Sequence, residues 1–204
     1  MLTSRVGKHI ILLNVDLIAD LTSRRAVKKL DIIEGFQGVA FGTMDGLITI
    51  LGVVIGIASA TENSGAVVIT GLVAGLANAF GNTFGFYASE LAERAEHIQE
   101  NQHLSSMTET RRSTFFAFVH SLASTIVIVA PFALFGLTSA MAASLILALA
   151  LLFALGALVG KFSHASPWRF GIRYVLLGLA GAALSFVVGQ AVRNLLTVGR
   201  YYPW

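Results

Sequence analysis

The sequence contains no cysteine and few charged residues. The absence of cysteine excludes disulfides, thiolate metal sites and cysteine nucleophiles. Only 12% of the 204 residues are charged, whereas 55% are hydrophobic, and the mean hydropathy is +0.76. A soluble globular domain of this composition would expose too much apolar surface to water. We therefore expect the chain to have lipid as its solvent.

Long apolar runs are abundant, and five of them are long enough to cross the roughly 30 Å hydrocarbon core of a bilayer as helices. They lie at about 36–59, 66–89, 114–137, 140–160 and 171–196. The alternating pattern of a β-barrel is absent, so helices must satisfy the backbone inside the bilayer. The predicted fold is an all-α integral membrane protein, with a five-helix transmembrane domain over residues 35–204.

The basic residues are distributed unevenly between the two sides of the predicted bundle. Six precede the first span, three lie between the second and third spans, and three lie around the connection between the fourth and fifth, so that one side holds twelve of the 14. The remaining two, Arg193 and Arg200, lie near the carboxyl end. Because Lys and Arg concentrate in cytoplasmic loops, we predict a cytoplasmic amino terminus and a carboxyl terminus outside.

Residues 1–34 form a separate amino-terminal segment. The apolar run 10–21 is interrupted by Asp16 and Asp20 and lacks a small-residue cleavage site, which argues against a removable signal. Basic residues at helical spacing favour an amphipathic helix on the inner membrane surface. A cytoplasmic helix that packs on its own bundle is the alternative.

Asp45 is the one acidic residue well inside a predicted span. Placing a carboxylate there costs about 2.5–3.5 kcal/mol on insertion scales, and such residues usually mark an ion or proton pathway. Thr49 lies one turn away on the same face. The alternative is a structural aspartate that bonds a neighbouring helix.

The second span carries two amides, Asn78 and Asn82, on one helical face. Amides in lipid must find partners, so they can join helices as readily as bind a cation. Three pairs of glycines at four-residue spacing, at 52 and 56, 71 and 75, and 81 and 85, indicate close helix contacts. His120 in the third span is interpreted as a packing residue, although an intramembrane histidine can also relay protons.

After the second span, a helix over residues 90–103 is predicted to carry acidic and histidine side chains along one stripe. This acidic stripe consists of Glu90, Glu93, Glu96, His97, Glu100 and His103. Like charges at these spacings destabilise a helix, and a bound divalent cation would relieve the repulsion. Oxygen and imidazole ligands suit iron(II), manganese, cobalt or zinc. A solvated helix with no metal is the alternative.

Several stretches resemble the vacuolar iron transporter family. Residues 41–49 (FGTMDGLIT) and 52–56 (GVVIG) are similar to its first-span signature, and residues 71–77 (GLVAGLA) and 85–89 (GFYAS) resemble its second span. The resemblance implies a homodimer that exports divalent iron or manganese from the cytoplasm in exchange for protons. It also implies that Asp45 is the pathway aspartate and that the first two spans form the dimer interface through their glycine faces.

Two positions depart from the family pattern. Asn82 stands where the family usually has a methionine, and Phe86 stands where it has a glutamate. Met44, beside Asp45, is a candidate replacement for the thioether, although it points about 100° away around the helix. The larger cytoplasmic metal-binding domain of the family is reduced here to the stretch from Glu90 to His103.

The predicted function is therefore export of iron(II) or manganese(II) along a pathway lined by Asp45, Met44, Thr49, Asn78 and Asn82. A membrane metal sensor or scaffold that does not transport is the alternative. No catalytic motif supports an enzyme. We expect no permanently bound cofactor and no nucleic-acid partner, because the basic residues form no common face. The partners are then lipid, metal ions, protons and a second copy, in the plasma membrane or an organelle membrane.

Overall fold

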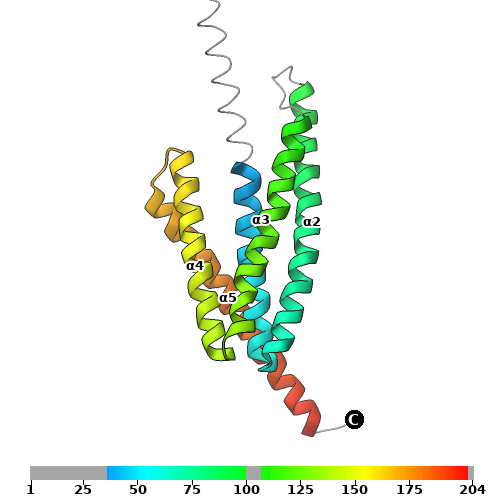
Figure 1. Ribbon diagram of the computed structural model, residues 1–204, viewed down its shortest axis with the longest axis vertical. Coiled ribbons are helices and arrows are strands. Elements are labelled where there is room, and N and C mark those ends of the chain that lie inside the picture. The colour runs from blue at the N-terminus through cyan, green and yellow to red at the C-terminus, as the bar shows by residue number, and fades with distance from the viewer. Residues whose placement is uncertain (1–35, 100–106, 202–204) are drawn as a thin grey trace, which may run out of the picture.

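The computed structural model describes residues 36–99 and 107–201, and these residues form helices and turns with no strand. The predicted amphipathic segment at residues 1–34 lies outside the described residues. The helices are the first helix (Phe36–Thr61), α2 (Ser64–Gln99), α3 (Met107–Leu134), α4 (Leu137–Phe162) and α5 (Pro167–Tyr201). Figure 1 shows the first helix between the α2–α3 pair on one side and the α4–α5 pair on the other.

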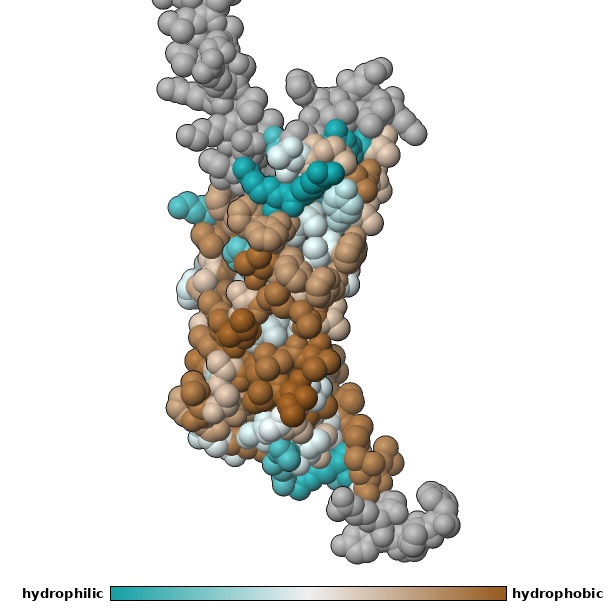
Figure 2. Space-filling view, turned by 45° about the vertical axis from the view of Figure 1, so that its right-hand side comes forward, coloured by the Kyte–Doolittle hydropathy of each residue, from teal (hydrophilic) through white to brown (hydrophobic). Residues whose placement is uncertain are grey.

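All five helices are long and apolar enough to span a membrane, which confirms the predicted all-helical, five-span fold. Many large apolar side chains face outward, among them Leu72, Phe84, Phe115, Ile126 and Leu184. Figure 2 shows the result as an apolar belt between hydrophilic residues at the two ends of the molecule. Such a belt is stable only against hydrocarbon, because exposing so much apolar surface to water is unfavourable.

Two helices differ in position from the predicted spans. α3 begins at Met107 and ends at Leu134, whereas the apolar run suggested 114–137. Thr110 and Ser113 are nevertheless buried, because the polar start of α3 packs inside the bundle where hydropathy gives no signal. α2 continues as one helix through Gln99, so the start of the acidic stripe is an extension of the second span.

The first helix supplies much of the buried core. Five of its apolar side chains are almost completely buried, and their spacings of three, one, three and four residues place them on one face. They are Leu47, Ile50, Leu51, Val54 and Ala58. The opposite face of the same helix carries Asp45. The first helix is therefore held rigidly by its neighbours, and Asp45 is positioned by that packing.

A seam of small residues, called here the glycine seam, joins the first helix to α3. A Cβ atom added to Gly38, Gly42 or Gly46 would overlap backbone of α3 or approach it within van der Waals distance. The atoms that it would meet belong to Ser113, Ala117, Ser121 and Ser124. Small residues at four-residue spacing on both helices allow this approach, as they do in other membrane helix pairs. The glycines at 38, 42 and 46 were not among the pairs that the sequence singled out.

The three predicted glycine pairs have different surroundings. Gly71 and Gly75 pack against Val129 and Thr125 of α3, and Gly52 and Gly56 lie against Ser185 of α5. Gly81 and Gly85 of α2 meet nothing within 4 Å. Two of the pairs thus serve contacts within the chain, and the third leaves an open face on α2.

α5 crosses the first helix diagonally (Figure 1) and contacts it near the carboxyl end of the first helix. The Ser59 hydroxyl donates a hydrogen bond to the Phe186 carbonyl at 3.4 Å, and a Cβ on Gly189 would overlap Ser59 and Gly56. The Arg193 guanidinium bonds the Glu62 carboxylate at 2.5 Å. Because both of these charged side chains are well exposed, the ion pair contributes little stability, and the glycine contact fixes the crossing.

The glycine seam leads to a first prediction. Gly42→Ala should destabilise the bundle by about 1–3 kcal/mol, because the added methyl group overlaps the Ala117 backbone. Gly81→Ala is the matched control, since it has open space and should gain up to about 1 kcal/mol of helix propensity. Thermal unfolding in detergent measures both variants. Equal midpoints for the two would show that the seam does not hold the helices together.

Candidate functional site

The Asp45 carboxylate lies in a cluster of neutral polar side chains from the first helix and α2. The Asn78 amide donates to Asp45 Oδ2 at 2.6 Å, and the Asn82 amide donates to the same oxygen. The Asn82 amide also donates to Asn78 Oδ1 at 2.9 Å. The Thr49 hydroxyl lies 3.4 Å from Asp45 Oδ1 as a donor. The structure thus brings together Asp45, Thr49, Asn78 and Asn82, which the sequence selected separately.

These contacts explain how an aspartate is tolerated at this depth. Amide and hydroxyl donors replace water around the carboxylate, which offsets part of the cost of moving it into a low-dielectric region. No cationic side chain of the described residues bonds Asp45. The ionised cluster therefore keeps one net negative charge, and a proton or a metal cation can neutralise it.

The cluster is one level of a ladder between the first helix and the antiparallel α2. Asp45 faces Asn82, Phe41 faces Phe86 with 5.1 Å between ring centroids, and the Gln37 amide donates to Glu90 at 2.8 Å. Each step is four residues along one helix and four back along the other, so the side chains form a single row. The sequence analysis missed Gln37 and Phe41, although their spacing from Asp45 was a usable signal.

The aromatic step separates two polar steps of this ladder. Phe86 is 7% exposed, and its ring packs against Phe41 between the Glu90–Gln37 pair and the Asp45 cluster. The helix positions of Asn82, Phe86 and Glu90 are consecutive turns of one face. The two phenyl rings therefore interrupt the row of polar groups between Glu90 and Asp45.

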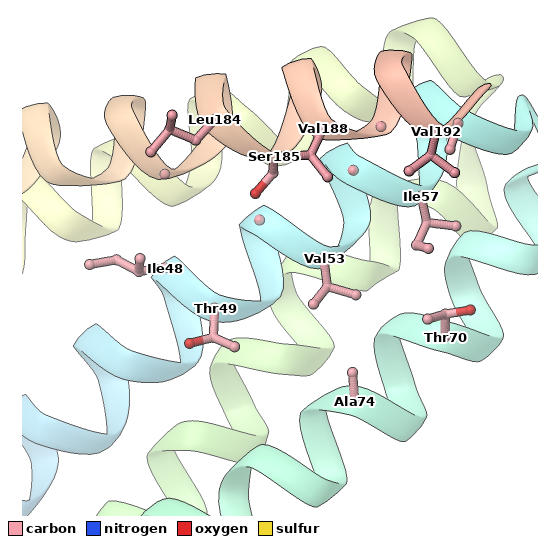
Figure 3. A pocket seen from close by; sticks show the side chains of 15 residues that line it. Ile48, Thr49, Val53, Ile57, Thr70, Ala74, Leu184, Ser185, Val188 and Val192 are labelled. Carbon is pink, nitrogen blue, oxygen red and sulfur yellow. The ribbon is translucent and has the colours of Figure 1, made fainter. Parts of the chain in front are cut away.

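On the other side of Asp45 lies a cavity of about 690 Å³, called here the hairpin cavity. It is lined by the first helix, α2 and α5, as Figure 3 shows, and most of its lining is apolar. Thr49 both lines this cavity and bonds Asp45. Val53 and Ala74 continue the ladder along its wall. The hairpin cavity therefore reaches the Asp45 cluster through Thr49.

Met44 is not brought to the cluster. It lines a different cavity on the other side of the first helix, together with Val159 of α4 and Tyr174 of α5. The rotation of 100° per residue that separates Met44 from Asp45 accounts for this placement. Within the described residues, Met44 thus supplies no thioether to the Asp45 cluster.

The described part of the acidic stripe consists of Glu90 and Glu93. Glu90 turns toward the first helix through its bond to Gln37, whereas Glu93 is exposed. The side chains of Glu96, His97, Glu100 and His103 lie outside the described residues. Among the residues that the structure does describe, no group of three or more His, Asp or Glu side chains is close enough to hold a metal ion. Metal binding by the stripe stays a prediction.

The polar residues of α3 bond mainly to their own helix. His120 Nδ1 lies 2.9 Å from the Phe116 carbonyl, and the Ser124 hydroxyl donates to the His120 carbonyl at 2.8 Å. Such bonds to the carbonyl four residues earlier satisfy polar side chains locally. His120 is thus satisfied without any contact to the Asp45 cluster.

Comparison with known proteins agrees with this arrangement. The model of the VIT family matches residues 36–113, which contain the whole ladder and both steps that flank Asp45. An uncharacterized protein of Methanocaldococcus jannaschii is 30% identical over an alignment of 172 residues, gaps included, that covers 77% of this chain and 90% of that protein.

The chain belongs to the VIT family. Membership identifies it as a multi-pass integral membrane protein of the metal-transporter kind, in agreement with the five apolar helices. The family match ends at Ser113, the α3 residue that packs against Gly38 of the first helix. The VIT signature thus coincides with the part of the fold that positions Asp45.

The cluster leads to a second prediction, a double-mutant cycle on Asp45 and Asn82. Asn82→Leu should cost about 1–3 kcal/mol of unfolding free energy, because it removes a donor from a carboxylate that has few others. In an Asp45→Leu background the same change should cost at least about 1 kcal/mol less. Denaturant unfolding in detergent measures the coupling.

Thr61→Val provides the control for this cycle. The Thr61 hydroxyl donates to the Ile57 carbonyl and accepts from the Asn63 backbone N–H, and neither bond involves Asp45. Its effect should therefore add to that of Asp45→Leu within about 0.5 kcal/mol. If the effects of Asp45→Leu and Asn82→Leu were also additive, the hydrogen bonds between the two side chains would contribute nothing to stability.

Proposed function

We propose that this VIT-family protein exports iron(II) or manganese(II) from the cytoplasm in exchange for protons, as a homodimer. The observation that carries the proposal is the ionisable carboxylate of Asp45, inside a membrane span and bonded only to neutral donors. A carboxylate in such surroundings attracts a cation into low dielectric and also accepts a proton. One group can therefore take part in both halves of an exchange.

The two amides suit both states of this exchange. In the structure their NH₂ groups point at Asp45. Rotation of each amide about its last side-chain bond would present the carbonyl oxygen instead, because the two ends of an amide have nearly the same shape. Asp45, Thr49 and the two asparagines would then offer only oxygen ligands to a cation. An all-oxygen set suits manganese(II), and the imidazoles of the acidic stripe extend the choice to iron(II).

The ladder provides a route through the membrane. In the predicted orientation Glu90 and Gln37 face the cytoplasm, and the hairpin cavity faces the outside. A cation captured by the acidic stripe would pass Glu90, reach Asp45 and leave through the hairpin cavity. The Phe41–Phe86 pair lies across this route, so the two rings must separate during each cycle. They would act as the inner gate.

The open glycines of α2 support the proposed dimer. Gly81 and Gly85 meet no atom within 4 Å, and each lies three residues after one of the two asparagines, on the adjoining helix face. A second copy that packs on these glycines would approach the Asp45 cluster closely. The two copies together would then supply two aspartates to one pathway, which fits the small number of acidic ligands in a single chain.

The same aromatic pair is the observation that favours the second candidate, a metal sensor or scaffold that does not transport. If the rings never separate, metal bound at the acidic stripe cannot reach Asp45. Flux measurements distinguish the two functions, because only the transporter moves metal across the membrane.

The third prediction tests transport. Asp45→Asn keeps the size and hydrogen bonds of the side chain but removes the charge, so flux of iron(II) and manganese(II) into proteoliposomes should fall to background. Flux through the unchanged protein should increase with an imposed pH gradient that supplies protons from the opposite side. Normal transport by Asp45→Asn would contradict the proposal.

A second set of substitutions removes charges that lie outside the membrane span. Replacing Glu93, Glu96 and Glu100 by Gln should weaken capture of dilute metal and leave flux at saturating metal largely intact, because charges in water are hydrated cheaply. Protonation of His97 and His103 should weaken capture as the pH falls through about 6.5. Metal binding by the intact protein with no flux of any divalent cation would favour the sensor or scaffold.

The fourth prediction concerns the dimer. Gly85→Leu should lower dimer formation in detergent at least tenfold, because the new side chain fills the open face on which the second copy packs. The fold should persist, since the glycine meets nothing within its own chain. Cross-linking and light scattering measure the dimer.

Gly52→Leu is a useful contrast to Gly85→Leu, because the added side chain would meet Ser185 of α5 in the same chain. It should lower the unfolding temperature, whereas Gly85→Leu should not. A dimer that survives Gly85→Leu unchanged would place the interface on another face.

A further inference from the structure

The turn between α4 and α5 has a well-defined backbone that presents basic side chains. The Ala165 N–H bonds the Gly160 carbonyl at 2.8 Å, the His164 N–H bonds the Lys161 carbonyl at 3.3 Å, and His164 has a φ of 53°. These two bonds and the left-handed residue constitute a Schellman motif. Pro167 then begins α5. The exposed basic groups here, called the basic turn, are Lys161, His164, Arg169 and Arg173.

Among the described residues, the positive charges of the basic turn have no acidic partners. The last acidic residue of the sequence is Glu109, so α4, α5 and the turn between them contain none. In the described part of the chain, Lys161, Arg169 and Arg173 form no ion pair, and Arg173 lies over the Phe170 ring at 5.3 Å. Their charge must be balanced by groups outside the helices that carry them.

An apolar cavity of about 410 Å³ opens beside this turn. Val159, Phe162 and Ser163 of the α4 end and Tyr174 of α5 form one wall of this turn cavity, and the first helix forms the other through Ala40 and its neighbours. Its size is within the range of ligand pockets, and nearly all of its lining is apolar. The turn cavity therefore accepts hydrocarbon next to a cluster of cations.

The exposed ring of Trp168 favours a position of the turn at a membrane surface. Trp168 is 67% exposed and packs edge-on against Phe153, with 5.2 Å between the ring centroids. Tryptophan is enriched where the headgroups meet the hydrocarbon, because one end of its ring is polar. Basic groups at that level face the phosphates of the lipid.

From these observations we propose that the α4–α5 turn is a binding site for one anionic phospholipid. Lys161, Arg169 and Arg173 contact the phosphate and headgroup, and one acyl chain occupies the turn cavity. The charges explain the preference for an anion, and the apolar cavity explains the preference for a lipid over free phosphate. The turn cavity shares Gln37 and Phe41 with the ladder, but no residue that bonds Asp45 lines it. Because the cations of the site lie on α4, α5 and their turn, the inference does not depend on metal transport.

Binding of phosphatidylglycerol to the delipidated full-length chain in neutral detergent tests the proposal, with native mass spectrometry as the readout. Phosphatidylglycerol should bind more tightly than phosphatidylcholine with the same acyl chains. The variant K161Q/R169Q/R173Q should lose roughly tenfold or more of its affinity for phosphatidylglycerol and approach that for phosphatidylcholine. Because all three side chains are exposed, the helices should still fold.

Two further variants separate the roles of charge and cavity. Ala40→Trp fills the turn cavity and should weaken binding of both lipids, whereas Ala142→Trp, which fills a cavity at Ile55 and Met141, should not. Arg193→Gln is the charge control, since Arg193 is already paired with Glu62.

Three results would overturn the proposal. The first is unchanged binding of phosphatidylglycerol by the triple variant, and the second is an equal loss in Arg193→Gln. The third is displacement of the lipid by an equal concentration of inorganic phosphate, which would identify a free-anion site instead.

Discussion

The structure depends on the requirement that a carboxylate inside the membrane be solvated by protein. Asp45 meets this requirement with two amides and a hydroxyl, all within one helical hairpin. These neutral groups stabilise the charge without cancelling it, whereas a lysine or arginine in the same place would have formed a permanent ion pair. A carboxylate held in this way offers a site that a mobile cation can occupy, and this property connects the packing with the proposed transport.

Close packing around the rest of the first helix makes this arrangement possible. The glycine seam brings α3 into backbone contact at Gly42, and the buried leucines and valines of the same helix hold the bundle together. The polar ladder lies on a neighbouring face of the first helix, where it contacts α2.

The two ends of the bundle have different electrostatic character. One end carries Glu90 at the top of the ladder and, at the junction of α4 and α5, the basic turn, which has no acidic partner among the described residues. The other end carries the exposed Glu62–Arg193 pair near the mouth of the hairpin cavity. Cations would meet carboxylates where the route begins, while the basic turn faces lipid phosphates away from that route.

The sequence by itself determined the five apolar helices, because hydropathy over about 20 residues directly reflects the thickness of hydrocarbon. It also determined that Asp45, Asn78 and Asn82 are the unusual polar groups, and the family resemblance agreed with the VIT match. Only the tertiary structure decided which groups meet: that Phe86 stacks on Phe41, that Glu90 bonds Gln37, and that Met44 faces another cavity. Helical periodicity gives the face of each residue within its own helix, but the rotation and register between helices arise from glycine contacts between segments distant in sequence, which no local pattern encodes.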